Sequence, residues 1–197
     1  MIYEDLLLSS GADIKMYKAN DVIFREGEPV LYYYQIMEGK VKLNNYNEDG
    51  KEFIQNIFSD GQSFAESLLF IERPYPMNAE AICDSKILKL PKSNFLKLIE
   101  ENPEISSNIY HCLADRMYYK YIMLYNLSFQ NPESKLKLFM DYLKSYQEDK
   151  KPYSFEVPLT RQQLASLTGL RVETVIRAIK GMEKNEVLKI KNRKIYY

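Results

Sequence analysis

Charged and polar side chains recur at helical spacing near the C-terminal end of the sequence. A helix from about Arg171 to Met182 is predicted to bury Val175, Ile176 and Ile179. Its other face then presents Arg171, Glu173, Thr174, Arg177 and Lys180. Arginine can bond O6 and N7 of guanine bidentately, and glutamate can accept a hydrogen bond from the amino group of cytosine. This face therefore suits contact with the edges of DNA bases.

The residues before this helix predict another helix and a sharp turn between the two. Thr160 is an N-cap residue, and Gln163 completes a capping box. Gly169 supplies the turn, because glycine adopts a positive φ without steric cost. Two short helices joined in this way form a helix-turn-helix, whose second helix can lie in the major groove. The start of the first helix is a further candidate DNA contact, through Thr160, Arg161 and Gln162.

A basic hairpin is predicted after the second helix. Val187–Ile190 and Ile195–Tyr196 predict two short strands, and the turn between them carries Arg193, another candidate DNA contact. From Arg161 onward there are nine Lys and Arg residues against three acidic ones, a surplus that suits the phosphates of a nucleic acid. A charged helical face is usually only solvated. The cap, the glycine turn, the exposed charges and the basic wing in this order favour binding of double-stranded DNA.

The first half of the sequence has the pattern of an all-β domain. Short segments rich in aromatic and branched residues alternate with turns such as Asp49-Gly50 and Asp60-Gly61, which indicates a sandwich or barrel. The predicted strands are Ile14–Tyr17, Asp21–Phe24, Leu31–Met37, Lys40–Asn47, Glu52–Phe58, Met77–Ala81 and Ser85–Leu90.

A long helix is predicted from Glu104 to about Phe129, because this stretch holds neither glycine nor proline. Its apolar residues fall near the spacing of a coiled-coil seam. The helix could pack on its own barrel or on a second copy of the chain, and its length favours a homodimer. The predicted dimer interface is Ile109, Leu113, Met117 and Leu124.

Composition divides the chain and excludes several functional classes. The 197 residues carry 27 basic and 27 acidic side chains, but residues 131–197 hold 14 basic against 8 acidic. With a single histidine, two isolated cysteines and no phosphate-binding glycine motif, the sequence predicts no enzyme, no metal site and no cofactor. No run is long and apolar enough for a membrane helix, so a cytoplasmic protein is expected.

The whole chain from about residue 14 onward resembles the Crp/Fnr-type transcriptional regulators. The similarity lies in Val22–Glu28 and Tyr34–Leu43, which are similar to sensor strands, and in Leu159–Lys180, which is similar to the DNA-reading helices. The resemblance implies an α+β fold. Its parts are an N-terminal double-stranded β-helix (jelly-roll) sensor at residues 1–102, a dimerisation helix at 103–130 and a winged helix-turn-helix at 131–197.

The same resemblance implies a homodimer on a palindromic promoter site, with RNA polymerase as a partner through the loop Glu148–Tyr153. Glu173 and Arg177 match the two most typical base-contacting positions of the family. Val172 departs from the cyclic-AMP receptor branch, which has Arg there, and Ile176 departs from the Fnr branch, which has Ser. The half-site sequence therefore stays open.

The expected effector pocket consists of Phe64, Ala65, Glu66, Tyr75, Lys120 and Tyr121. Gly61–Glu66 resembles the entry to a cyclic-nucleotide site, where the glutamate takes a ribose hydroxyl. The phosphate-binding Arg-Ser/Thr of the family is replaced by Tyr75-Pro76. A buried cyclic phosphate would then lack a charge-assisted partner, so cyclic nucleotide is disfavoured and the effector is unknown.

One alternative comes from a different functional class. The chain could be a small-molecule-binding module whose C-terminal helices contact protein and not DNA. Salt separates the two, because a DNA reader loses affinity steeply as salt rises.

Overall fold

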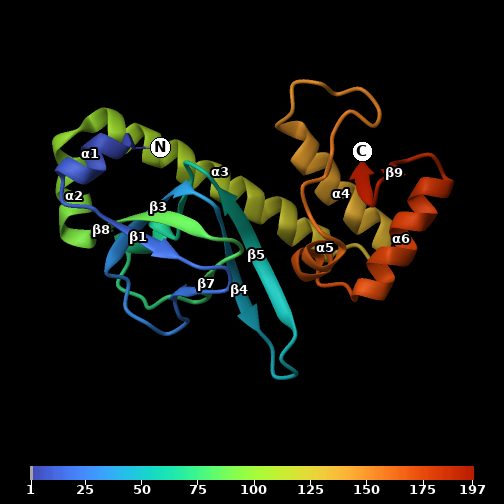
Figure 1. Cartoon of the computed structure of the whole chain (residues 1–197), viewed down its shortest axis with the longest axis horizontal. Coiled ribbons are helices and arrows are strands. Elements are labelled where there is room, and N and C mark those ends of the chain that lie inside the picture. The colour runs from blue at the N-terminus through green and yellow to red at the C-terminus, as the bar shows by residue number, and fades with distance from the viewer. Residues whose placement is uncertain (1) are drawn as a thin grey trace. The chain divides into compact units, whose positions relative to one another are not determined.

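The computed structural model describes residues 2–197, which form two compact units (Figure 1). The division falls between Arg116 and Met117, inside the long helix α3 (Pro103–Leu127). The first unit carries most of the strands and the second is mainly helical. The α+β fold class predicted from the sequence is confirmed.

The first unit is a sandwich of two antiparallel four-stranded sheets. One sheet has the order β1-β8-β3-β6 and the other β2-β7-β4-β5. The bounds are β1 Asp13–Tyr17, β2 Val22–Phe24, β3 Tyr32–Glu38, β4 Lys40–Tyr46, β5 Glu52–Ser59, β6 Ser63–Phe64, β7 Asn78–Ala81 and β8 Ser85–Pro91. All seven predicted strands form, with ends shifted by at most one residue. The sequence missed β6, because two residues give no alternation to detect.

Aromatic rings fill the space between the two sheets. Phe24 stacks on Tyr75 with ring centroids 3.7 Å apart, and Tyr34 stacks on Phe64 at 5.3 Å. Phe58 lies 6.1 Å from Phe64, and all five side chains are buried. Such pairs add to the stabilisation from burial alone. The interior of the sandwich is therefore closely packed with this chain's own rings.

Helices pack against the sheet that contains β3. These are α1 (Glu4–Ser9), α2 (Lys92–Glu101) and the start of α3. The side-chain amide of Gln35, on β3, donates a hydrogen bond to the backbone carbonyl of Ile2. The ring of Phe95 from α2 stacks on the ring of Tyr33, with centroids 4.6 Å apart. Ile109 of α3 is only 2% exposed in this core, and Leu113 packs against it. Two of the four side chains predicted for a dimer interface thus serve the sensor's own core.

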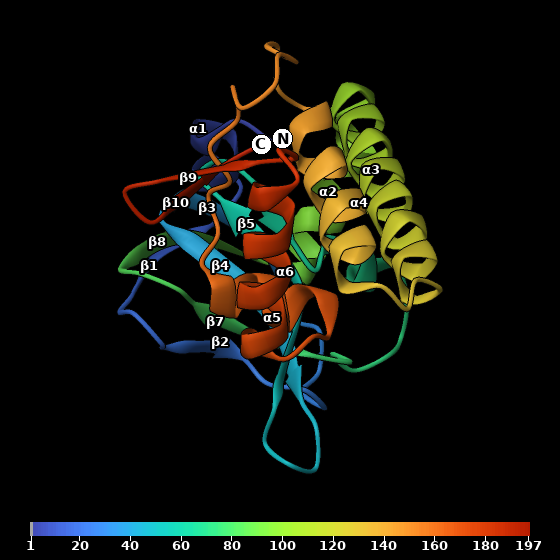
Figure 2. The ribbon, with the colours of Figure 1, turned by 90° about the vertical axis from the view of Figure 1, so that its right-hand side faces the viewer.

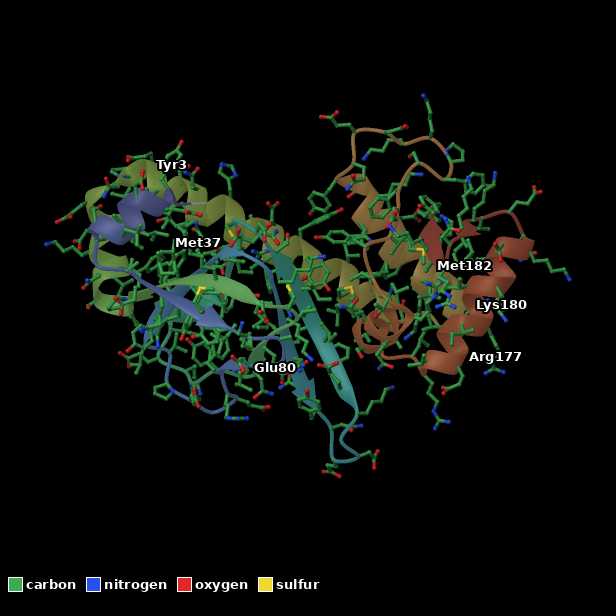
Figure 3. The ribbon with its side chains drawn as sticks, viewed as in Figure 1. Tyr3, Met37, Glu80, Arg177, Lys180 and Met182 are labelled. Carbon is green, nitrogen blue, oxygen red and sulfur yellow. The ribbon has the colours of Figure 1, made fainter. Side chains whose placement is uncertain are left out.

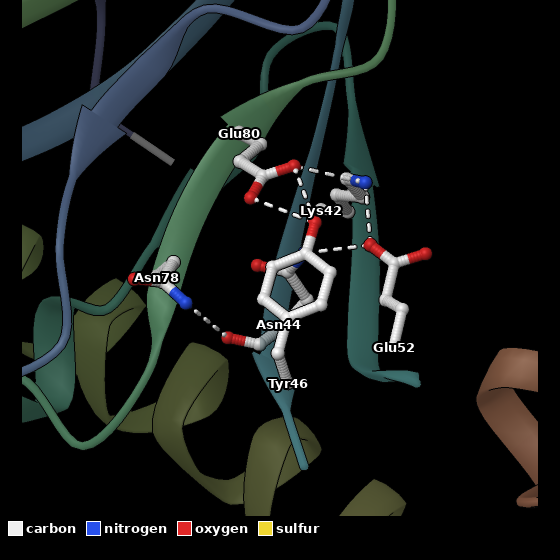
Figure 4. Close-up of polar contacts among 6 residues, drawn as sticks. All are labelled: Lys42, Asn44, Tyr46, Glu52, Asn78 and Glu80. Carbon is white, nitrogen blue, oxygen red and sulfur yellow. Dashed lines mark hydrogen bonds and ion pairs between the residues drawn. The ribbon is translucent and has the colours of Figure 1, made fainter. Parts of the chain in front are cut away.

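A charged cluster crosses three strands of the other sheet (Figure 4). The Lys42 ammonium lies 2.5 Å from Glu52 Oε1 and 2.9 Å from Glu80 Oε2. Asn44 donates to Glu52 at 2.6 Å, and the Tyr46 hydroxyl donates to Glu80. Although burial alone would lower it, the pKa of Lys42 is raised by its hydrogen bonds with the two carboxylates. The cluster joins β7, β4 and β5 through side chains as well as backbone.

The second unit packs helices α4, α5 and α6 together beside a small hairpin (Figure 2). The bounds are α4 Pro132–Ser145, α5 Arg161–Thr168, α6 Val172–Lys184, β9 Lys189–Lys191 and β10 Lys194–Tyr196. The side chain of Asn131 caps α4 by accepting from the backbone of Glu133 at 2.8 Å. Gly181 of α6 faces the first turn of α4, where a Cβ would clash with the Glu133 carboxylate unless that side chain moved. The segment before α5 pairs with β10 through one isolated bridge, between Glu156 and Tyr196.

Candidate nucleic-acid interface and sensor site

The helix-turn-helix starts with the capping box that the sequence predicts. Thr160 Oγ1 accepts a hydrogen bond from the backbone of Gln163 at 3.1 Å, and the Gln163 side chain accepts from the backbone of Thr160 at 2.9 Å. Gly169 ends α5 with a φ of +71°, a conformation that favours glycine. The cap and the turn fix where α6 begins, at Val172.

The buried face of α6 differs from the predicted one at a single position. Val175, Ala178, Ile179 and Met182 are buried, the i, i+3, i+4, i+7 set of an amphipathic helix. Ile176 was expected among them, and this prediction is wrong: its side chain is 40% exposed. The helical period places it one position beyond the buried stripe, beside the charged residues.

The opposite face of α6 carries the predicted base-contacting residues. Glu173, Arg177 and Lys180 are exposed, and Figure 3 shows Arg177 and Lys180 projecting outward from the helix. Across residues 2–197 none of the three forms an ion pair or a side-chain hydrogen bond, so their charges are available to a partner. Arg171, also exposed, is the N-cap residue of α6, and Thr174 is half-buried.

The wing, which is the hairpin formed by β9 and β10, is attached to the start of α5. The Arg161 guanidinium donates to the carbonyl oxygen of Arg193 at the wing tip, where Asn192 and Arg193 have positive φ values of 50° and 65°. Lys194, next to the wing tip, pairs with Glu156 at 2.7 Å. The structure thus brings together the start of α5, the exposed face of α6 and the wing. Gln162 is exposed at the start of α5.

The sensor unit contains a buried carboxylate, Glu66, at the start of the short 3-10 helix η1 (Glu66–Phe70). The residue is 2% exposed and follows Ala65, whose backbone is left-handed with a φ of 58°. Glu66 Oε1 lies 3.4 Å from Nε of Arg116 and accepts from the Cys112 thiol at 3.2 Å. Arg116 also donates to the Ser63 carbonyl at 2.8 Å. Its guanidinium lies 4.4 Å from the centre of the Phe58 ring.

The residues of α3 that reach Glu66 differ from those expected. The predicted pocket included Lys120 and Tyr121, whereas the contacts come from Cys112 and Arg116. Lys120 and Tyr121 belong to the second unit, and Tyr121 is exposed. One signal in the sequence could have found Arg116, since it is the only arginine on the long helix. Burial, and then the nearby Glu66 carboxylate, raise the pKa of the Cys112 thiol, which disfavours the reactive thiolate.

Tyr75 occupies the place where the resemblance predicts a phosphate-binding arginine. Its ring is 2% exposed and stacks on Phe24, and its backbone is bonded to Gly27 and Glu28. Phe64 is also buried, with its ring centroid 6.2 Å from that of Phe24. Arg73, two residues earlier, is exposed. The sensor therefore has a carboxylate at Glu66 that an arginine of the same unit already neutralises, and an aromatic ring at Tyr75.

Two family models match consecutive parts of the chain. Residues 14–102 match the cyclic nucleotide-binding domain, and residues 136–197 match the Crp-like helix-turn-helix domain. The chain belongs to the Crp/Fnr family of transcriptional regulators. As a Crp/Fnr regulator it is a DNA-binding protein and not an enzyme.

Known transcriptional regulators are similar in sequence to most of this Crp/Fnr chain. It is 27% identical to the "cAMP-activated global transcriptional regulator CRP" of Haemophilus influenzae, covering 87% of this chain and 78% of the relative. It is also 27% identical to a "probable transcriptional activator" of Rhizobium leguminosarum, covering 86% of this chain and 70% of that one.

Solved structures share the fold. CooA from Carboxydothermus hydrogenoformans matches with a TM-score of 0.84 at 18% identity, over 100% of this chain and 87% of CooA. The c-di-GMP responsive regulator CLP of Xanthomonas campestris matches with a TM-score of 0.78 at 19% identity, over 98% and 96%. Among the described residues of this Crp/Fnr regulator, no helix is long and apolar enough to cross a membrane.

The contact between Glu66 and Arg116 predicts an asymmetry between single and double variants. Arg116→Met leaves a buried carboxylate without its cation and should lower the free energy of unfolding by about 3 kcal/mol. Glu66→Gln combined with Arg116→Met removes both charges and should cost clearly less. Urea denaturation followed by circular dichroism measures both. If the double variant were as unstable as Arg116→Met alone, the charge of Glu66 would not be what Arg116 stabilises.

Proposed function

We propose that this regulator is a homodimer that binds a palindromic promoter site through one α6 helix per half-site, without cyclic AMP. The observation that carries the proposal is the exposed face of α6, where Glu173, Arg177 and Lys180 have no partner within residues 2–197. Side chains of these types can read bases and neutralise phosphates. Arg161 at the start of α5 and Arg193 at the wing tip extend the basic surface. The cytoplasm, where promoter DNA lies, is the expected location.

An exposed apolar stripe on α3 supports the homodimer. Tyr110, Ala114, Met117, Tyr121 and Leu124 follow one another at alternating intervals of four and three residues, and all are exposed. This is the spacing of a coiled-coil seam. We therefore assign the interface to this stripe, which keeps Met117 and Leu124 of the sequence prediction and replaces Ile109 and Leu113. Because a palindrome has two-fold symmetry, a symmetric dimer can match both half-sites.

The sensor site supports independence from cyclic AMP. Glu66 Oε1 is already bonded to Arg116 and Cys112, which leaves a ribose hydroxyl only the second carboxylate oxygen, Oε2. A cyclic phosphate would meet the buried Tyr75 ring, and a buried phosphate without a cationic partner is costly. We infer that the nucleotide pocket is degenerate and that any effector acts by stabilising one arrangement of the sensor over another. The loop Glu148–Tyr153, whose first five residues are exposed, is the proposed contact for RNA polymerase.

Selection from random double-stranded DNA tests the proposal, with the purified full chain at near-physiological salt and with or without cyclic AMP. We expect the same palindrome to be enriched in both arms. Enrichment only with cyclic AMP would contradict the degenerate pocket. Enrichment in neither arm would contradict the proposal for the unliganded protein and favour a protein-contacting role for the C-terminal helices.

Arg177 and Lys180 should affect binding differently, although both are exposed on α6. Arg177→Ala should cost about 1–3 kcal/mol on the selected site and relax the base preference at one position, because a bidentate base contact is lost. Lys180→Ala should weaken binding to selected and random DNA alike, because a phosphate contact carries no sequence information. Fluorescence anisotropy on both DNAs measures this. An equal loss on the two DNAs for Arg177→Ala would make Arg177 a phosphate contact.

Leu127 provides a control for testing the role of Leu124 in the stripe on α3. Leu124 lies on the stripe and Leu127 lies off it, yet their side chains are similarly exposed, at 66% and 62%. Leu124→Glu should place like charges across the seam and raise the dimer dissociation constant by about tenfold or more, whereas Leu127→Glu should leave it nearly unchanged. Sedimentation equilibrium measures both constants. A monomeric wild-type chain, or equal effects of the two variants, would contradict this interface.

A further inference from the structure

An apolar side chain stands on the charged face of α6. Ile176 is 40% exposed and lies among Glu173, Arg177 and Lys180. From residue 147 to 197, all of which the structure describes, it is the only large apolar side chain classed as exposed. The helix does not require it there, because Val175, Ala178, Ile179 and Met182 already form the buried stripe. Ile176 therefore offers an apolar surface to whatever contacts this face of α6.

Ile176 lies in a pocket whose lining indicates the chemistry of a partner. Ile176 lines an open pocket of about 470 Å³ together with Ile179, Ile190, Lys180, Arg161 and Arg193. Three isoleucines supply the apolar lining, and three cations from α6, α5 and the wing tip surround them. Arg161 and Arg193 are held together by the hydrogen bond from the guanidinium to the wing-tip carbonyl. The pocket thus combines a positively charged rim with an apolar surface.

A DNA strand carries the matching groups. Its phosphates are anionic, and thymine presents a C5-methyl group in the major groove, where the other base edges offer hydrogen-bond donors and acceptors. A phosphate suits the three cations, and a thymine methyl suits the isoleucine that lies beside the base-contacting residues. A serine at this position would offer a hydroxyl and much less apolar surface.

We propose that Ile176 is a specificity-determining residue that recognises the methyl group of one thymine in each half-site. Lys180, Arg161 and Arg193 hold the phosphate backbone of the adjoining strand against the same pocket. The inference rests on the proposed DNA binding and adds a base preference to it. The contact is apolar, so its discrimination comes from burial of the methyl group and not from a hydrogen bond.

The experiment removes the methyl group from the DNA and the isoleucine from the protein. Each thymine of the selected half-site is replaced in turn by deoxyuridine, which keeps the base pair and lacks only the methyl. Dissociation constants are measured for the wild type, Ile176→Ser and Ile176→Val at one salt concentration. Ile176→Val keeps a branched apolar surface and is the conservative variant. Thermal unfolding of each protein shows whether α6 and the wing remain folded.

One thymine per half-site should respond to deoxyuridine. For the wild type we expect about fourfold weaker binding per methyl removed, the effect of withdrawing one methyl group from an apolar contact. The loss should persist in Ile176→Val and vanish in Ile176→Ser, whose binding to the thymine site should be correspondingly weaker. Arg177→Ala should bind more weakly but keep the deoxyuridine effect, because its contact is with a different group.

Three results would overturn the inference while leaving the proposed function intact. These are a selected half-site without thymine, no deoxyuridine effect in the wild type, or the same effect in Ile176→Ser as in the wild type. Failure to select any palindrome would overturn the proposed function and this inference together. In that case a protein partner with acidic and apolar groups would be the better match for the pocket.

Discussion

A carboxylate as deeply buried as that of Glu66 requires a cationic partner, and here the partner comes from a helix 50 residues further along the chain. Arg116 supplies the positive charge through Nε, and its Nη2 donates a hydrogen bond to the Ser63 carbonyl. These contacts fix the position of α3 against β6 and the η1 turn. The remaining features of the sensor depend on this placement, because α3 then has one face committed to the core.

The two faces of α3 have different surroundings. Ile105 and Ile109 complete the core of the sandwich, and further along Tyr119 packs on Tyr142 of α4 at 5.3 Å. The opposite face keeps Tyr110, Met117, Tyr121 and Leu124 exposed. The apolar residues of this 25-residue helix are distributed around more than one side. This distribution also explains why the apolar positions alone did not distinguish core from interface.

The recognition unit follows from a simpler constraint. Once the cap at Thr160 and the turn at Gly169 set the start of α6, burial of its apolar stripe leaves Glu173, Arg177 and Lys180 toward solvent. The hairpin β9–β10 adds Arg193 at its tip, bonded to Arg161. The basic surface is therefore a by-product of how the apolar residues pack. Ile176 is the exception, since burial of the stripe exposes an apolar side chain as well.

The sequence by itself determined the features that depend on local rules. Alternation and glycine turns predicted the strands, the capping box predicted the start of α5, and residue types predicted the charged face of α6. Tertiary structure decided which side chains from distant segments meet. It placed Arg116 and Cys112 at Glu66, Ile109 in the sensor core, and Ile176 in solvent beside the wing. Local rules depend on neighbours within one turn or one strand. These contacts depend instead on how elements far apart in the chain pack together, and the spacing of residues within one segment does not encode that packing.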